Sequence, residues 1–172
     1  LIQGITDEEM RNLQVTDLEW PEGSTFVHTP FAIVVQCQHQ RYAEVEFGSE
    51  GFIGIIRYFK DEQIIREDVY DDRGFISSSL YYEEGQPIYR NYLNAKGVWQ
   101  LCHFFDGRGI VANPRTDGRF EKSYYGDLSE VIWEFLNKFL AEEVEVADRF
   151  VIASDLRHNK HLFEHLPAEN TK

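Results

Sequence analysis

Residues 70–98 read YDDRGFISSSLYYEEGQPIYRNYLNAKGV, and this stretch decides the fold. Two runs rich in aromatic and β-branched residues, 75–82 and 87–93, are bounded by short polar segments that hold Gly74, Gly85 and Gly97. These segments consist of residues that tolerate positive φ angles or that bond their own backbone. Connections this short join only antiparallel neighbours, so the stretch predicts part of an antiparallel β-meander.

The same alternation of strand and turn extends in both directions from this stretch. Gly74, Gly85 and Gly97 are spaced by 11 and 12 residues, and Gly51 precedes Gly74 by 23 residues, close to two such units. This spacing indicates a weak internal repeat of one strand and one turn. The pattern predicts nine strands, at residues 25–29, 32–38, 42–47, 52–59, 63–70, 75–82, 87–93, 98–105 and 109–113.

Helical patterns flank the predicted sheet. Thr6 and Glu9 form a weak helix-start signal near the N-terminus, and the strand rhythm stops after Pro114. Asp127 followed by Glu130 predicts the start of a helix over 128–143. Its apolar residues recur at helical spacing: Leu128, Val131, Ile132, Phe135, Leu136, Phe139 and Leu140. A buried strand over 149–154 and a short helix over 156–166 complete an αβα piece, so we expect an α+β fold.

Composition limits the class of protein. The chain has 172 residues and a formal net charge of −13, which disfavours a nucleic-acid surface because phosphate binding uses clustered Lys and Arg. Neither an apolar run of membrane-spanning length nor a basic leader followed by an apolar stretch occurs in the sequence. Two cysteines are too few for a disulfide scaffold. We therefore expect a soluble, cytoplasmic domain that begins inside a longer protein.

The alternation of residues inside the strands predicts a surface suited to binding. In 98–105 one face carries Trp99, Leu101, His103 and Phe105, and the other carries Val98, Gln100, Cys102 and Phe104, so both faces are partly apolar. Tyr and Arg are enriched at binding surfaces, and we predict Tyr81, Tyr89, Tyr92 and Arg66 as contact residues. The alternative is ordinary cross-strand packing of aromatic residues on a solvated face.

Catalytic and metal-binding patterns are weak in this sequence. His161 and His165 have the spacing of two helical metal ligands, with His158 nearby, but a polar terminal helix explains them as well. The adjacent Asp71 and Asp72 are typical of a turn. The sequence contains neither a glycine-rich phosphate loop before a helix nor a serine in a nucleophile elbow. We expect no catalytic residue, no metal site and no cofactor.

Five runs of sequence resemble a known family. They are 25–31 (TFVHTPF), 70–78 (YDDRGFISS), 81–83 (YYE), 92–100 (YLNAKGVWQ) and 148–154 (DRFVIAS). These runs are similar to the glycosyltransferase-like protein of the accessory Sec system, the first of the Asp series. That Gram-positive machinery exports serine-rich repeat adhesins that are glycosylated before secretion.

The resemblance implies an extended β-sheet domain inserted into the first Rossmann-like half of a GT-B type protein. It divides the chain into an N-terminal segment of that half (1–24), the sheet (25–113) and a loop, helix and return to the Rossmann-like half (114–172). A related inserted sheet occurs in protein O-GlcNAc transferases, where it contacts acceptor polypeptide or a partner subunit. The donor-sugar motifs of such enzymes belong to the second Rossmann half, so no catalytic residue carries over.

Two functions therefore remain open, beside a third interpretation in which the meander is purely structural. In the first, the chain is a non-catalytic accessory Sec component, located in the cytoplasm or at the translocon, whose sheet binds other Asp proteins or the adhesin polypeptide or glycan. In the second, it is the acceptor-binding sheet of a GT-B protein O-glycosyltransferase. The apolar face of the 128–143 helix also predicts either packing onto the sheet or association with another copy.

Overall fold

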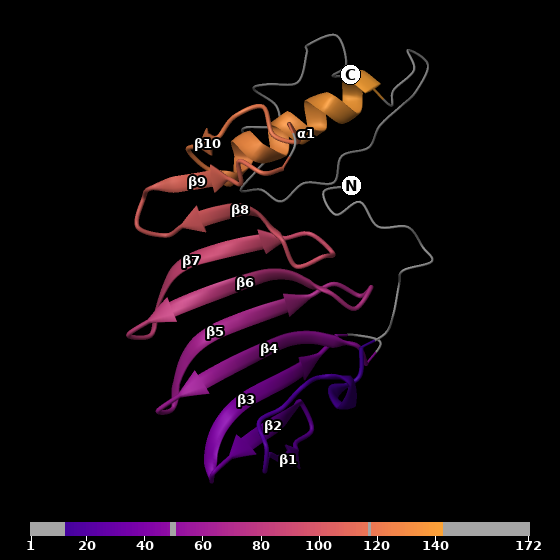
Figure 1. Cartoon of the computed structure of the whole chain (residues 1–172), viewed down its shortest axis with the longest axis vertical. Helices are drawn as coiled ribbons and strands as arrows, with labels where there is room; N and C mark the ends of the chain where they lie inside the picture. The colour runs from indigo at the N-terminus through magenta and orange to yellow at the C-terminus, as the bar shows by residue number, and fades with distance from the viewer. Residues whose placement is uncertain (1–12, 49–50, 117, 143–172) are drawn as a thin grey trace.

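The computed structural model of the chain describes residues 13–48, 51–116 and 118–142. One long sheet dominates it, with a 3-10 helix, η2 (Val15–Asp17), before the sheet and an α-helix, α1 (Leu128–Glu142), after it (Figure 1). None of the described helices has the length and apolar character needed to cross a membrane. The strands are β1 (Thr25–His28), β2 (Ala32–Cys37), β3 (Gln40–Phe47), β4 (Ile53–Lys60), β5 (Gln63–Tyr70), β6 (Ile76–Glu83), β7 (Gln86–Leu93), β8 (Trp99–Phe104), β9 (Gly109–Ala112) and β10 (Tyr124–Tyr125).

The predicted antiparallel meander is confirmed. The strands lie in the order β1 to β10, and every strand is antiparallel to its neighbour in sequence. All nine predicted strands are present with ends shifted by at most two residues. The sequence missed β10, because a strand of two residues has no periodicity to detect and exists only through its pairing with β9.

The turns at the two long sides of the sheet differ. On one side, two-residue turns at Gln38-His39, Asp61-Glu62 and Glu84-Gly85 have positive φ angles at both positions, as in a type I′ turn whose twist matches that of the flanking strands. On the other side, wider turns end in a glycine such as Gly74, where φ is 83°. Successive two-residue turns lie 23 residues apart, so the repeat detected in the sequence is a hairpin of two strands.

A bulge accompanies each hairpin from β2–β3 to β7–β8. In every case the second strand carries one extra residue, which increases local twist and interrupts the two-residue alternation of side chains. The extra residues follow one another at intervals of 11 or 12, and they are Tyr42, Gly54, Ile65, Ser77, Ile88 and Gln100.

The bulges correct one prediction about the faces of the sheet. Strict alternation placed Trp99 with Leu101, on the face opposite Cys102. Gln100 is the extra residue in β8, so Trp99 lies on the same face as Cys102. The two faces of the sheet differ in the side chains they carry. The tyrosine face carries Tyr58, Tyr81 and Tyr89, and the helix face carries the side chains on which α1 packs.

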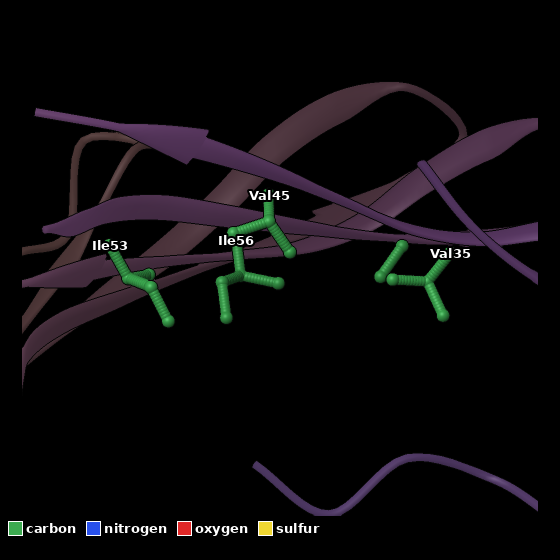
Figure 2. Close-up of a cluster of buried hydrophobic side chains, with 5 residues drawn as sticks. Val35, Val45, Ile53 and Ile56 are labelled. Carbon is green, nitrogen blue, oxygen red and sulfur yellow. The ribbon is translucent and has the colours of Figure 1, made fainter. Parts of the chain in front are cut away.

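The first hydrophobic cluster lies on the tyrosine face near β1. Val35, Val45, Ile53 and Ile56 are buried there, and Figure 2 shows their side chains on one side of the strands. The chain before β1 covers them with Leu13, Val15, Leu18 and Trp20. The indole N–H of Trp20 donates to the carbonyl oxygen of Val15 at 2.8 Å, which holds this covering segment in a compact turn.

The second cluster lies on the helix face at the other end of the sheet. Leu101, Ile110 and Tyr125 are buried there beneath Val131 of α1. The predicted helix cap is confirmed, because the Asp127 carboxylate accepts from the backbone N–H groups at the start of the helix. The described residues therefore cover the sheet on opposite faces at its two ends, and none of them covers the tyrosine face toward β9 and β10.

The apolar stripe predicted for α1 is divided in the structure. Leu128, Val131 and Phe135 pack toward the sheet, whereas Ile132 and Phe139 are more than one third exposed. The prediction that the helix packs onto the sheet is confirmed for the first group. The predicted helix near Thr6, the strand over 149–154 and the helix over 156–166 lie outside the described residues, and the division of the chain at residues 24 and 113 stays a prediction.

Candidate functional site

A row of aromatic and arginine side chains crosses the tyrosine face. The strand register places Tyr58 opposite Arg66, Arg66 opposite Tyr81, and Tyr81 opposite Tyr89. Tyr89 in turn lies opposite Phe104. Directly opposite residues on one face have Cβ atoms about 4.5–5.5 Å apart, so the five side chains form one continuous row. We call this set the tyrosine row.

The rings of the tyrosine row contact one another. Tyr81 and Tyr89 stack with centroids 4.6 Å apart and an interplanar angle of 20°. Tyr89 and Phe104 are tilted at 6.2 Å, and the guanidinium of Arg66 lies 4.2 Å from the centroid of Tyr58. Stacked rings hold each other in place, so they offer a rigid surface that loses little side-chain entropy when a ligand binds.

An open hollow of about 350 Å³ adjoins the end of the row. Its lining is almost entirely apolar and aromatic, and consists of Tyr89, Asn91, Trp99, Cys102, Phe104 and Val111. Val111 and the neighbouring Tyr124 are exposed, and no described element covers the hollow. Recessed aromatic surfaces of this kind accept apolar side chains or stack on planar groups.

A buried polar network supports the other half of the row. The Asp68 carboxylate is 1% exposed, accepts from the Ser79 hydroxyl at 2.7 Å and lies 3.0 Å from the guanidinium of Arg66. Burial raises the pKa of Asp68, and the Ser79 hydroxyl and Arg66 partly offset that effect. The ion pair holds Arg66 between Tyr58 and Tyr81, so the guanidinium belongs to the row instead of extending freely into solvent.

The structure brings together three of the four predicted contact residues. Tyr81, Tyr89 and Arg66 lie in the tyrosine row. Tyr92 lies on the helix face, where it pairs with Leu101 and packs against the second cluster. Tyr89 and Tyr92 are three residues apart in one strand, and an odd separation without a bulge puts two side chains on opposite faces.

Sequence reasoning missed Tyr58, Phe104 and Trp99 as members of this surface. Tyr58, Tyr81 and Phe104 are spaced by 23 residues, which is the length of one hairpin, so the repeat alone would have aligned them. Trp99 could not be found in this way, because its face depends on the bulge at Gln100.

The uncovered part of the helix face has a different character. Arg57 bonds to Glu46 and, at 3.0 Å, to Glu67, whose other oxygen lies 3.7 Å from Arg90. The opposite charges on neighbouring strands are paired with one another, and the paired side chains form a charged, partly solvated surface. The continuous row of aromatic side chains, in contrast, lies on the tyrosine face.

The described residues offer no metal centre or reactive group to this surface. No cluster of three or more His, Cys, Asp or Glu residues suited to a metal ion occurs among them, and His158, His161 and His165 lie outside the described residues. Burial raises the pKa of the Cys102 thiol in the hollow, which disfavours its thiolate. The aromatic rings, the guanidinium of Arg66 and the apolar hollow are groups suited to binding a ligand.

The turn interpretation of the Asp71-Asp72 pair is confirmed. The Asp71 carboxylate accepts from the Arg73 backbone N–H at 3.1 Å and from its guanidinium at 2.6 Å and 2.8 Å. These bonds lower the pKa of Asp71 to about 2. The carboxylate is therefore engaged within its own turn.

Comparison with known proteins gives one family. Over residues 1–172 the chain matches the family model of the accessory Sec system protein that is numbered first in the Asp series. The protein of that name from Streptococcus gordonii is 40% identical over 168 residues, which make up 96% of this chain and 32% of the relative. The one from Staphylococcus aureus is 26% identical over 170 residues, 98% of this chain and 33% of the relative. The chain thus spans about a third of the length of the curated relatives it matches.

Solved structures agree with this result. A chain of "accessory secretory protein 1,2 and 3" from Streptococcus pneumoniae superposes with a TM-score of 0.87 at 34% identity, over 98% of this chain and 34% of that one. A chain of the Gap123 complex from Streptococcus agalactiae superposes with a TM-score of 0.84 at 35% identity, over 92% of this chain and 32% of that one. A chain of the GtfA/B complex bound to UDP and GlcNAc superposes with a TM-score of 0.67 at 13% identity, over 79% of this chain and 31% of that one. This is a likeness of fold alone.

Proposed function

Since the chain belongs to the family of the first accessory Sec system protein of the Asp series, we propose that it forms the extended-sheet part of a non-catalytic component of the accessory Sec machinery. The tyrosine face is the surface on which this component holds a segment of the exported serine-rich repeat adhesin. Binding precedes export, so the component works on the cytoplasmic side of the membrane.

The partners follow from the relatives. Two of the similar solved chains belong to complexes, one of accessory secretory proteins 1, 2 and 3 and one named Gap123. We place this protein in a complex of the same kind with the other Asp proteins of its system. Among the described residues, the charged part of the helix face around Arg57, Glu46 and Glu67 is left for such contacts while the tyrosine face holds polypeptide.

One observation carries the proposal: the stacked Tyr81 and Tyr89 lead directly into the aromatic hollow, and no described element covers either. A tyrosine row buried only for stability would be covered, as the first cluster is by residues 13–20. Aromatic and arginine side chains dominate the energies of binding surfaces, and truncating such an anchor costs about 2–4 kcal/mol.

The test uses the full-length protein and a synthetic serine-rich repeat peptide, bare and glycosylated. Tyr81→Ala and Tyr89→Ala are expected to weaken peptide binding by tenfold or more in fluorescence anisotropy. Tyr82→Ala is the matched control, because Tyr82 follows Tyr81 in β6 but its side chain lies on the opposite face. Circular dichroism establishes that each variant is folded.

Equal loss in Tyr81→Ala and Tyr82→Ala, or unchanged binding in both tyrosine-row variants, would contradict the assignment of this face. Arg66→Ala adds a third measurement on the same row. A difference between the bare and glycosylated peptides would show whether the surface reads the sugar or the polypeptide.

A further inference from the structure

The outer edge of β1 is open in a way that the opposite end of the sheet is not. No described residue pairs with β1 on the side away from β2. At the far end, β10 is only two residues long and continues into the chain that leads to α1, which packs against it. Natural proteins protect exposed edges with charged residues or proline inside the strand. β1 reads TFVH and contains neither a charged Lys, Arg, Asp or Glu residue nor a proline.

The backbone groups that face outward from β1 can be identified. The backbone N–H of Thr29, directly after β1, donates to the carbonyl oxygen of Ala32 at 2.9 Å, so it faces β2. Backbone groups alternate in direction along a strand, so those of Val27 also face β2. Phe26 and His28 therefore present their N–H and C=O groups to the open edge.

A large apolar side chain stands beside this edge. Phe31, in the turn between β1 and β2, is 86% exposed. The turn itself is firmly held, because the Thr29 hydroxyl donates to the Ala32 carbonyl oxygen at 2.8 Å and accepts from the Ala32 N–H at 2.9 Å. Val27 and Phe26 add further exposed apolar area. The held turn thus presents an exposed aromatic ring, and aromatic side chains are common binding anchors.

The negative charge near β1 determines which kind of partner its edge attracts. Residues 13–40 contain Asp17, Glu19 and Glu22 and contain neither Lys nor Arg. The chain as a whole carries −13, so two copies brought edge to edge repel each other. A basic partner is attracted to the same edge. Strand addition to an open edge gains main-chain hydrogen bonds whatever the partner's side chains are.

We propose that the outer edge of β1, together with Phe31, binds an extended β-strand of another protein in which apolar residues are flanked by lysine or arginine. The strand adds to the sheet beyond β1 through the N–H and C=O groups of Phe26 and His28. This surface is separate from the tyrosine row and hollow, so its test does not depend on the function proposed for them.

The experiment measures binding of a fluorescent peptide of alternating Thr and Val residues flanked by lysines to the full-length protein. Three peptide arms are compared: the lysine-flanked peptide, the same peptide flanked by glutamates, and the lysine peptide N-methylated at every Thr and Val residue, so that neither edge of the extended peptide keeps its donors. We expect the glutamate arm to bind at least tenfold more weakly and the N-methylated arm not to bind, because it lacks the main-chain donors.

Proline substitution separates pairing from folding. His28→Pro removes an outward N–H and keeps every bond to β2, and proline is tolerated in edge strands at such positions. It is expected to abolish peptide binding while leaving the circular dichroism spectrum and unfolding transition unchanged. Phe31→Ser is expected to weaken binding about fivefold, and it disturbs no packing because the ring is exposed.

Peptide binding that persists in His28→Pro would overturn strand addition at this edge. So would equal affinity for the N-methylated and unmethylated lysine peptides. Absence of binding by the lysine peptide would do the same. Sedimentation that shows a dimer of the wild-type protein and a monomer of His28→Pro would assign the edge to a second copy and overturn the proposal of a basic partner.

Discussion

Replacing Ile56 by alanine tests which face of the sheet the N-terminal segment covers. Ile56 is fully buried on the tyrosine face, between Val45 and Asp68 in the strand register. Ile55 precedes it in β4, lies on the helix face, is only half-buried and belongs to neither buried cluster. The pair therefore offers the same substitution on both faces of one strand.

The expected magnitude follows from the burial. Ile→Ala removes three carbon atoms, which at about 0.8 kcal/mol per buried carbon gives about 2.4 kcal/mol for transfer alone. The cavity left beneath residues 13–20 adds to this, so Ile56→Ala should lower the free energy of unfolding by about 3–4 kcal/mol. Ile55→Ala leaves no enclosed cavity and should cost about 1 kcal/mol.

The measurement is urea unfolding of the 172-residue chain, followed by circular dichroism for the whole sheet. Tryptophan fluorescence supplies a second probe, since the ring centroid of Trp20 lies 6.5 Å from that of Tyr42 in the same cluster. Equal losses in the free energy of unfolding for the two variants, with the same dependence of that free energy on urea concentration, would refute the view that the chain before β1 seals the tyrosine face at this end. So would a cost below about 1 kcal/mol for Ile56→Ala.

Three further predictions concern the turns and the far end of the sheet. Asp71→Asn keeps the side-chain acceptor for the turn but loses the charge. The Asp71 carboxyl titrates near 2 in the folded chain against 3.8 for its ordinary value, so the variant should be about 1–2 kcal/mol less stable at neutral pH. Because a lowered carboxyl pKa stabilises the fold above the unfolded value, urea titrations should show this difference vanishing as the pH falls from about 4 to about 2, and a pH-independent difference would contradict it. Glu134→Ala should cost about 2–3 kcal/mol in urea unfolding, because the buried hydroxyl of Tyr125 loses its acceptor, and a cost below about 0.5 kcal/mol would show that this bond does not hold α1 to the sheet. Gly109→Ala should destabilise by more than about 2 kcal/mol, since its Cβ would lie 2.6 Å from the Tyr125 carbonyl oxygen at a φ of 76°, and near-wild-type stability would mean that β10 moves freely.

The non-catalytic role proposed above gives a fifth prediction. The 172-residue chain should neither hydrolyse nor transfer sugar from a sugar nucleotide, which product analysis by chromatography would measure. Turnover by this chain that a single substitution abolishes would contradict the non-catalytic role.

Much of the fold could be predicted from local sequence. The meander followed from turns such as 71–74, which are too short to join anything but antiparallel neighbours. The helix start followed from Asp127, whose carboxylate satisfies backbone N–H groups one turn away. Both are decided by residues close together in the chain, so the sequence carries the whole of their physical cause.

The candidate site was only half predictable. Tyr81 and Tyr89 were identified as contact residues from their side-chain chemistry, and the structure stacks them on one open face. Tyr92 was grouped with them although its odd spacing from Tyr89 puts it on the other face. Trp99 was assigned to the wrong face, because a bulge shifts alternation by one residue and leaves no local signal in composition.

What the sequence by itself determined is therefore the series of strands, turns and one capped helix. Only the tertiary structure decided which face is buried at each end, where β10 pairs, and hence which aromatic residues remain open. The reason is physical: a strand with apolar residues on both sides is compatible with cover on either face. Which face is covered depends on segments distant in the chain, residues 13–20 for the first cluster and α1 for the second. These segments gain their free energy of packing only once the sheet has formed.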